Sequence, residues 1–364
     1  MSKIVAVIGA TGAQGIPTIK HLLAPSASGA PSPWKVRALT RNPDHRRAKE
    51  LRALGAELIQ GSYTDPNTIH RLFEGAHGAY VNTDGYTVGA AKELHTAFEI
   101  WEIAKYQKLR HFVWSNLDYA FKIGGFNPVY AADHCNAKGR FADYLSSQPS
   151  HIGRKEGTAW TVYTNGPYME LLGHHLLPFQ ILKDGTRVFA SPFGDEQAET
   201  GRWALIALDD LGWWSRHIFD NPQMTVGKEL KIASQVVSYP EIIRTFKRVT
   251  GLPAVYKSMS MDDYFAVWNR PEQRIAAGIP ASESRTWEAV MRGFFAMWRD
   301  NIVTRDMNWI DSVHRMQTLE EWMRKTEYTG ATRARQLLKG VEDHQTPPKL
   351  DLKYLDKYPS RTYD

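Results

Sequence analysis

The glycines near the start of the chain have the spacing of a phosphate-binding turn. They follow an apolar run over residues 5–8 and precede a segment with helical periodicity. In a turn from a buried strand to a helix, one glycine permits the tight turn, one lets the backbone approach a pyrophosphate, and one lets the helix lie close on the strand. The helix N-terminus then points unpaired N–H groups at the anion. The pattern predicts a dinucleotide site, with an ordinary glycine-rich turn as the alternative. The predicted binding residues are Gly9, Thr11, Gly12, Ala13, Gln14 and Gly15.

The end of the second predicted strand indicates which nicotinamide dinucleotide binds. An acidic residue at this position would bond the ribose 2′-hydroxyl of NAD, whereas an arginine accommodates the 2′-phosphate of NADP. The chain has Thr40 and Arg41 there and no acidic residue before Asp44. We therefore expect NADP(H) as the cofactor, with a solvent-facing charge as the alternative explanation of Arg41.

Polar residues also follow later strands, where the carboxyl ends of a parallel sheet border the nicotinamide half of the ligand. Asn82 and Thr83 are candidates for contacts after the fourth strand, and Ser115 ends the fifth. Further along, His134 and Lys138 are four residues apart, so they share one face of a helix. A lysine aimed at the cofactor can bond the nicotinamide ribose and lower the pKa of a neighbouring proton donor, for which His134 is the candidate. A solvated lysine and a hydrogen-bonded histidine explain the pair equally well.

The elements that must position these residues alternate between strands and helices. Short apolar runs predict the strands, and the segments between them predict helices, which is the pattern of βαβ units around a parallel sheet. We therefore expect an α/β fold with a Rossmann-type doubly wound parallel sheet. The predicted strands cover residues 4–8, 35–39, 57–60, 78–81, 111–115 and 159–164, and the predicted helices cover 16–23, 46–54, 66–73, 89–106 and 137–145.

The second half of the chain is less periodic and richer in aromatic residues. Asp184-Gly185 lies between two apolar runs and predicts a hairpin. A strand over residues 203–206 is expected to precede a capped helix over 211–218, and helical patterns dominate from 260 to about 328. We expect a smaller α+β lobe interleaved with the last sheet strands. The predicted domains are an NAD(P)-binding Rossmann core over residues 1–165, a substrate-binding lobe over 166–344 and a polar tail over 345–364.

Composition narrows the class of protein. The formal charge of +6 comes from scattered basic residues, which is typical of a solvated surface and makes nucleic acid an unlikely partner. The lone cysteine, Cys135, excludes an intramolecular disulfide and indicates a reducing compartment. No stretch is long and apolar enough to span a bilayer, and the first apolar run is too short for a signal peptide. We expect a cytoplasmic protein, or one that is both nuclear and cytoplasmic.

The combined pattern resembles the NmrA-like family, a branch of the atypical short-chain dehydrogenase/reductases. The resemblance covers most of residues 1–170, and it implies a Rossmann core that binds NADP(H) and a small C-terminal substrate lobe. It rests on residues 9–15, 36–41 and 112–115 and on His134-x-x-x-Lys138, and residues 305–310 and 318–323 are similar to the C-terminal region of fungal members.

The resemblance also implies catalytic and substrate-binding roles. Short-chain dehydrogenases carry Tyr-x-x-x-Lys, in which the tyrosine transfers a proton to or from the substrate oxygen. In this chain His134 stands at the tyrosine position, Lys138 is retained, and Ser115 occupies the strand end where a reductase places the hydroxyl that polarises its substrate. The residues just after the sixth strand are expected to form the pocket wall: Asn165, Tyr168 and Met169.

From these roles we expect an NADPH-dependent reductase of a small aromatic or polycyclic carbonyl or imine, in a fungal biosynthetic pathway. Ser115 would bond the acceptor atom, Lys138 would orient the ribose, and His134, Lys138 or a water would supply the proton. Two alternatives stay open. Because the family divides between enzymes and cofactor-sensing regulators, the chain could be a non-catalytic NADP(H) redox sensor that binds a partner protein. It could also be an isomerase or cyclase on the same fold.

Overall fold

The computed structural model describes residues 3–26, 28–151, 157–173, 176–177, 179–270, 272–276, 284–330 and 350–363. The chain forms two compact units, each with its own internal contacts. The first unit contains Met1–Asp118, His134–Asn165 and Leu208–Lys231, and the second contains Tyr119–Asp133, Gly166–Ala207 and Ile232–Asp364.

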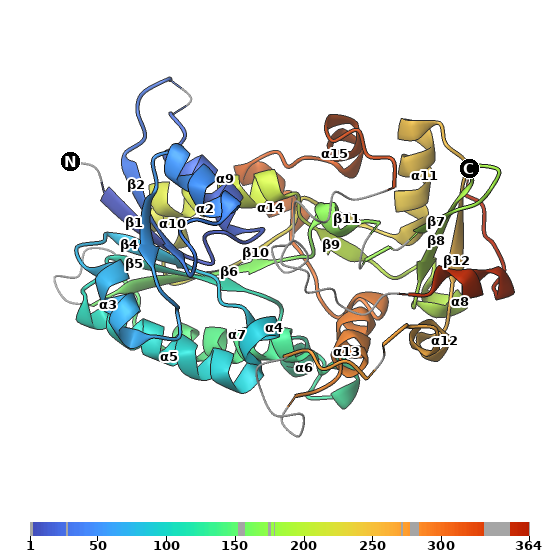
Figure 1. The fold of residues 1–364 in the computed structure, drawn as a ribbon, viewed down its shortest axis with the longest axis horizontal. Coiled ribbons are helices and arrows are strands. Elements are labelled where there is room, and N and C mark those ends of the chain that lie inside the picture. The colour runs from blue at the N-terminus through green and yellow to red at the C-terminus, as the bar shows by residue number, and fades with distance from the viewer. Residues whose placement is uncertain are drawn as a thin grey trace. The chain divides into compact units, whose positions relative to one another are not determined.

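The first unit is built on a seven-stranded sheet in the order β10-β6-β5-β4-β1-β2-β3 (Figure 1). The five neighbouring pairs among β1 to β6 are all parallel, and the order 3-2-1-4-5-6 is that of a doubly wound dinucleotide-binding sheet. The Rossmann-type fold is therefore confirmed. The strands are β1 (Lys3–Ile8), β2 (Trp34–Thr40), β3 (Glu57–Gln60), β4 (Gly78–Val81), β5 (His111–Asn116), β6 (Ala159–Asn165) and β10 (Glu229–Ile232).

Helices fill the connections between these strands. Their starts follow local chemistry: Asp65, for example, accepts a hydrogen bond from the Asn67 amide at the start of α3, and Pro66 occupies the first helical position. The helices are α1 (Gly15–Leu23), α2 (Arg46–Ala53), α3 (Pro66–Phe73), α4 (Gly85–Val88), α5 (Ala90–Tyr106), α7 (Asp133–Ser146), α9 (Leu208–Asp220) and α10 (Pro222–Thr225).

Helix α7 begins earlier than the sequence predicted. We expected a start at Ala137, but the helix begins at Asp133, so His134 lies within its first turn. The acidic side chain of Asp133 in that turn suits the positive end of the helix dipole. The earlier start places His134 and Lys138 on one regular helix.

The core of the first unit lies between the sheet and helices α3, α5 and α7, which run along one side of it (Figure 1). Large rings from both layers meet there. The centroids of Trp114 on β5 and Phe141 on α7 are 4.6 Å apart, and those of Phe112 and Trp101 on α5 are 5.1 Å apart. Burial of a side chain of this size stabilises a fold by roughly 2 kcal/mol or more, so this layer fixes α5 and α7 against the strand ends.

The second unit contains two small sheets and several helices. An antiparallel pair joins β9 and β11, and a separate three-stranded sheet has the order β12-β8-β7. The strands are β7 (Phe179–Ile181), β8 (Arg187–Ser191), β9 (Trp203–Leu205), β11 (Gln235–Val237) and β12 (Ala254–Ser258). The α-helices are α6 (Ala120–Ile123), α8 (Gly194–Gln197), α11 (Tyr239–Thr250), α12 (Met261–Ala266), α13 (Trp287–Arg299), α14 (Met307–Val313) and α15 (Leu319–Lys325), and the 3-10 helices are η1 (Pro128–Tyr130), η2 (Met169–Leu171) and η3 (Leu352–Lys357).

The predicted hairpin is present in this unit. Strands β7 and β8 pair antiparallel, and Gly185 between them has a φ of +86°, which suits glycine. The Asp184 side chain accepts a hydrogen bond from the Thr186 amide at 2.9 Å. The turn chemistry of Asp-Gly therefore sets the register of this strand pair.

Each unit includes a segment from the other side of the expected domain boundary between residues 165 and 166. Residues 208–231 belong to the first unit, to which they supply α9, α10 and most of β10, and residues 119–133 belong to the second. Within the expected tail, residues 345–349 lie outside the described residues. Farther on, Arg361 exchanges two backbone hydrogen bonds with Tyr256 of β12, at 2.8 and 2.9 Å, so the end of the chain packs on the second unit. The roles of cofactor core and substrate lobe stay predictions.

Candidate active site

The glycine turn lies at the carboxyl end of β1 and leads into α1. Gly9 has a φ of +77°, and a Cβ at that position would lie 2.6 Å from the Asn82 carbonyl oxygen. A Cβ at Gly15 would lie 2.3 Å from the Gly9 carbonyl oxygen, so a side chain there would force α1 away from the turn. Inside the turn the Gly12 amide donates to the Gly9 carbonyl at 2.9 Å. The positive φ and a close backbone contact thus require glycine at position 9, and close backbone contacts require it at position 15.

The same turn presents donors that fit a phosphate group. The backbone amides of Thr11 and Ala13 donate no hydrogen bond to any residue that the structure describes. The guanidinium of Arg47 on α2 is buried and donates to the Thr11 carbonyl at 3.2 Å, which places a positive charge beside the turn. Free amides next to a fixed cation are the chemistry that binds a pyrophosphate. Nothing in the local sequence separates Arg47 from its neighbour Arg46, which is half-exposed and paired with Glu50.

Gln14 connects this turn with two strands of the sheet. Its Oε1 accepts hydrogen bonds from Ser115 Oγ at 2.6 Å and from Tyr80 Oη at 2.8 Å, and all three side chains are buried. Burial raises the pKa of Tyr80 to about 12, so its hydroxyl stays protonated and remains a donor. Ser115 is 1% exposed, and its hydroxyl is occupied by Gln14. Polarisation of a substrate by Ser115 stays a prediction, and it requires this hydroxyl to change partner.

Lys138 on α7 reaches the carboxyl end of β4. Its Nζ lies 3.0 Å from the Thr83 carbonyl oxygen, 3.1 Å from Thr83 Oγ1 and 3.4 Å from Asn82 Oδ1. It forms an ion pair with Glu93 Oε1 at 3.2 Å and lies 5.1 Å from the centre of the Trp114 ring. The structure therefore brings together three residues that the sequence singled out, Asn82, Thr83 and Lys138.

Glu93 is a site residue that sequence reasoning missed. It lies in the first turn of α5, is fully buried, and accepts a hydrogen bond from Thr83 Oγ1 at 2.6 Å. A Cβ at Gly85 would lie 2.3 Å from Glu93 Oε2, so this glycine leaves room for the carboxylate. Nothing in the local pattern separates Glu93 from the more exposed Glu99 and Glu102 on the same helix. Only the tertiary contacts identify it.

His134 lies one helical turn before Lys138 and is 6% exposed. Burial, and to a lesser extent the positive charge of Lys138, lowers the pKa of His134 to about 3. Its ring stacks on that of Tyr86, with centroids 4.9 Å apart and planes at 29°. At neutral pH the imidazole is uncharged, so it holds no extra proton to give to a substrate. Lys138 and water are the donors that remain from the original expectation.

Thr40 and Arg41 lie at the end of β2, where the cofactor preference was predicted. Thr40 is buried, and its hydroxyl donates to the Asn42 carbonyl at 3.1 Å, so it shapes the turn. Arg41 is exposed immediately after the strand. Its side chain is accessible to a ligand phosphate, and the preference for NADP(H) stays a prediction.

The three residues expected to form the pocket wall belong to different units. Asn165 ends β6 in the first unit, where its Nδ2 donates to the Tyr163 carbonyl at 3.3 Å. Tyr168 and Met169 belong to the second unit, where Met169 is fully buried and Tyr168 is partly exposed. Their role in substrate binding stays a prediction.

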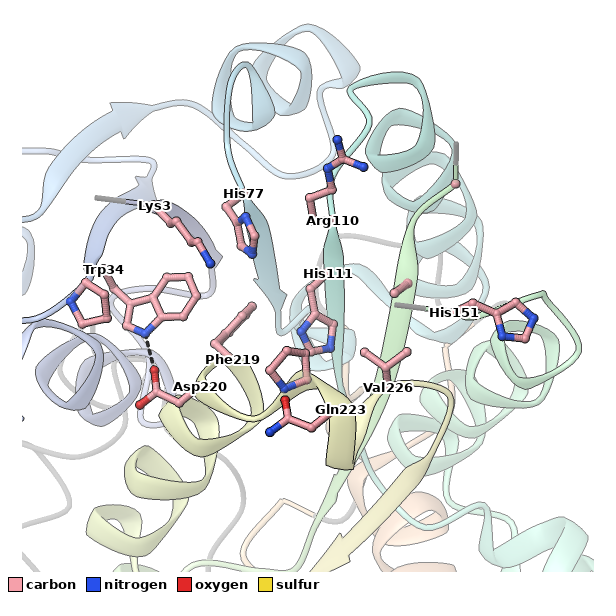
Figure 2. Close-up of a pocket in the computed structure, with 14 residues that line it drawn as sticks. Lys3, Trp34, His77, Arg110, His111, His151, Phe219, Asp220, Gln223 and Val226 are labelled. Atoms are coloured by element: carbon pink, nitrogen blue, oxygen red, sulfur yellow. Dashed lines mark hydrogen bonds between the residues drawn. The ribbon is translucent and has the colours of Figure 1, made fainter. Parts of the chain in front are cut away.

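A cavity of about 760 Å³ lies at the opposite ends of the sheet strands from the glycine turn (Figure 2). It is lined by residues at the amino-terminal ends of strands, including Lys3 of β1, Trp34 of β2 and His111 of β5. Ligands of doubly wound sheets bind outside the carboxyl ends of the strands, where the glycine turn and Lys138 lie. The cavity in Figure 2 is therefore separate from the candidate active site.

Two other kinds of feature are absent from the part of the chain that the structure describes. No group of three or more His, Cys, Asp or Glu side chains is arranged to hold a metal ion within the described ranges. No described helix has the length and apolar character needed to cross a membrane.

Comparisons with protein families and with known proteins agree on one family. The model of the NmrA-like family matches residues 1–285. The NmrA-like family domain-containing oxidoreductase himF of Aspergillus japonicus is 32% identical over 298 residues, which span 80% of this chain and 82% of that protein. The oxidoreductase notA' of Aspergillus versicolor, described in the same words, is 28% identical over 261 residues, 70% of each chain.

Solved structures share the fold at lower identity. NmrA, a negative transcriptional regulator in complex with NADP, has a TM-score of 0.67 at 19% identity, over 89% of this chain and 95% of that one. An NADPH-dependent quinone oxidoreductase from Escherichia coli, complexed with NADPH, has a TM-score of 0.63 at 18% identity, over 89% and 100% of the two chains. At these identities the likeness establishes the fold alone.

Proposed function

The chain belongs to the NmrA-like family, and from this premise we propose that it is an oxidoreductase that uses NADP(H). The observation that carries the proposal is the position of Lys138, whose ammonium lies at the carboxyl end of β4 against Thr83 and Asn82. In this fold that strand end borders the nicotinamide half of a bound dinucleotide. Relatives described as NmrA-like oxidoreductases support the same activity.

The residues present fit the cofactor. The free amides of Thr11 and Ala13 would hold the pyrophosphate, with the buried charge of Arg47 behind them. Arg41 would bind the 2′-phosphate that distinguishes NADP from NAD. At the other end, Lys138 would bind the hydroxyls of the nicotinamide ribose. The cofactor, when bound, supplies the hydride.

The proposed reaction is reduction of a small aromatic or polycyclic carbonyl or imine, in fungal secondary metabolism. Lys138 orients the cofactor and stabilises negative charge that develops beside it. Ser115 is the candidate to bond the acceptor atom, once its hydroxyl leaves Gln14. Lys138 or a water supplies the proton, because His134 is uncharged at neutral pH. We further propose that the enzyme works in the cytoplasm, without a membrane or nucleic acid partner.

One observation favours a second candidate function. The tyrosine of Tyr-x-x-x-Lys is replaced by His134, whose burial keeps it from carrying a proton at neutral pH. A structural neighbour with this fold is described as a negative transcriptional regulator in complex with NADP. The chain could therefore sense the redox state of NADP(H) and bind a partner protein without turnover.

Titration with the four nicotinamide dinucleotides, followed by NADPH oxidation assays on a panel of aromatic carbonyls and imines, separates the two candidates. The oxidoreductase predicts tight NADPH binding and substrate-dependent oxidation that needs Lys138. The sensor predicts a strong preference between NADP⁺ and NADPH and no oxidation with any member of the panel.

A further inference from the structure

We propose that Glu93 is a positioning residue, whose buried carboxylate holds Lys138 as a charged anchor at the carboxyl end of β4. The inference rests on the proposed cofactor function, because the anchored ammonium is the group expected to meet the nicotinamide ribose. Glu93 is 0% exposed and Lys138 is 7% exposed, so the pair is shielded from water.

Three side chains in this cluster contact one another. Glu93 Oε1 lies 3.2 Å from Lys138 Nζ and accepts from Thr83 Oγ1 at 2.6 Å, while Lys138 Nζ lies 3.1 Å from the same Thr83 oxygen. Within the described ranges, Glu93 is the only carboxylate paired with Lys138. Because an uncompensated buried ammonium is very unfavourable, the carboxylate is what permits Lys138 to be both buried and charged.

The contacts around Nζ also indicate how a ligand could enter. An ammonium has three hydrogens, and Nζ lies within 3.4 Å of four acceptors, on Thr83 (two), Asn82 and Glu93. The contact with Asn82 is the longest, at 3.4 Å, whereas hydrogen bonds to an ionised acceptor are the strongest kind. A ribose hydroxyl can therefore replace a neutral acceptor while the ion pair with Glu93 keeps Nζ in place.

The carboxylate is poorly explained as a purely structural feature. Its second oxygen, Oε2, is buried and accepts no hydrogen bond from any residue that the structure describes. Burial of a half-satisfied carboxylate costs free energy that an apolar side chain would avoid. The first turn of α5 and the absence of a side chain at Gly85 reduce that cost, since the helix dipole favours a negative charge there and the glycine leaves space. An unsatisfied oxygen is expected if the carboxylate is present to pair with Lys138 and not to stabilise the fold.

The test compares Glu93→Gln, which removes the charge at constant shape, with Glu93→Asp, which keeps the charge on a shorter side chain. Glu102→Gln is the matched control, because it removes one charge from an exposed site on the same helix. We expect Glu93→Gln to raise the NADPH dissociation constant about tenfold or more and to lower kcat, as loss of a charge-assisted contact would. Glu93→Asp should recover part of both, and Glu102→Gln should change neither. If Glu93→Gln only lowers the melting temperature, with NADPH affinity and kcat of the folded protein unchanged, the proposal is overturned.

A double-variant cycle with Lys138→Met separates this inference from the proposed function. In the Lys138→Met background, Glu93→Gln should have no further effect on NADPH affinity, and the double variant should melt higher than the sum of the single losses predicts. Additive losses in melting temperature would overturn the pairing, whether or not the protein binds a cofactor. A wild-type protein that binds no NADPH would instead overturn the proposed function, and the melting cycle alone would then decide the pairing.

Discussion

Ser115 Oγ donates a 2.6 Å hydrogen bond to Gln14 Oε1, which joins the end of β5 to the glycine turn after β1. Gln14 immediately precedes α1, so this contact ties the proposed phosphate-binding turn to the strand end expected to meet the substrate. Tyr80 holds the same oxygen from β4 at 2.8 Å. Three strand ends are thus connected through one buried amide.

Ser115→Ala should therefore act on both cofactor binding and turnover. The variant removes one buried hydrogen bond, worth about 1 kcal/mol, and leaves Gln14 with Tyr80 as its donor. We expect the NADPH dissociation constant to rise about fivefold, and kcat to fall about tenfold or more because Ser115 is the candidate to bond the acceptor atom. Binding titrations and steady-state kinetics provide the check. A kcat within about threefold of the wild-type value would instead limit the hydroxyl to its contact with Gln14.

Gly9→Ala should abolish tight cofactor binding. Gly75→Ala is its control, because Gly75 also has a positive φ, +64° against +77°, but a Cβ there would meet nothing within 4 Å. Both variants should lose about 1–2 kcal/mol from the left-handed backbone conformation. Only Gly9→Ala should also collide with the Asn82 carbonyl and weaken NADPH binding more than about tenfold. Equal NADPH affinities in the two variants would show that the turn does not hold the dinucleotide.

Arg41→Ala should reduce the preference for NADPH over NADH. If the exposed guanidinium binds the 2′-phosphate, its loss should weaken NADPH about tenfold or more and leave NADH unchanged. Arg52→Ala removes an exposed arginine from α2 and should alter neither affinity. Parallel titrations of NADPH and NADH with the three proteins measure the ratio. A ratio in Arg41→Ala equal to that of the wild type would contradict the assignment.

Stability should fall as the pH drops from about 6.5 toward 3. Burial lowers the pKa of His134 to about 3, so in this window the unfolded chain binds a proton that the folded chain does not. Stability therefore rises with pH by up to about 1.4 kcal/mol per unit for this residue, and about 2 kcal/mol is lost between pH 7 and pH 5. His111, whose pKa burial also lowers to about 3, adds a loss in the same direction.

Denaturant unfolding at pH 7 and pH 5 measures this loss. His134→Phe keeps a ring against Tyr86 and cannot be protonated, so it should lose about 2 kcal/mol less than the wild type between the two pH values. His95→Ala, which removes an exposed histidine from α5, should behave as the wild type does. The same pH dependence in His134→Phe and the wild type would show that His134 titrates normally.

The sequence was sufficient for six of the seven sheet strands, because these are apolar runs that end at glycine or polar residues, but it missed β10. None of the six predicted strands differs from the structure by more than one residue at either end. Helix α7 was placed too late, since its first turn is polar and lacks the apolar spacing that marks a helix. Residues 208–231 could not be assigned to the first unit from local pattern, because membership of a sheet depends on long-range pairing.

Some residues of the candidate site could likewise be predicted from the sequence, and others could not. Asn82 and Thr83 followed from the rule that ligands meet the carboxyl ends of parallel strands, and Lys138 followed from its four-residue spacing to His134. The structure brings the three residues together. Glu93 and Arg47 did not follow, because a charged residue is buried only when distant partners compensate it. The spacing of residues along a helix gives no information about such distant partners.

The measurement that tests the central claim most directly is NADPH oxidation by the wild type and by Lys138→Met on a panel of aromatic carbonyls and imines. We expect substrate-dependent oxidation by the wild type and a loss of about 100-fold or more in kcat/KM for the variant, because Lys138 is the charged group that we propose to meet the nicotinamide ribose. Melting curves of both proteins, recorded alongside, ensure that folded protein is compared. NADPH that binds tightly but is oxidised by neither protein with any substrate would contradict the oxidoreductase and favour the redox sensor.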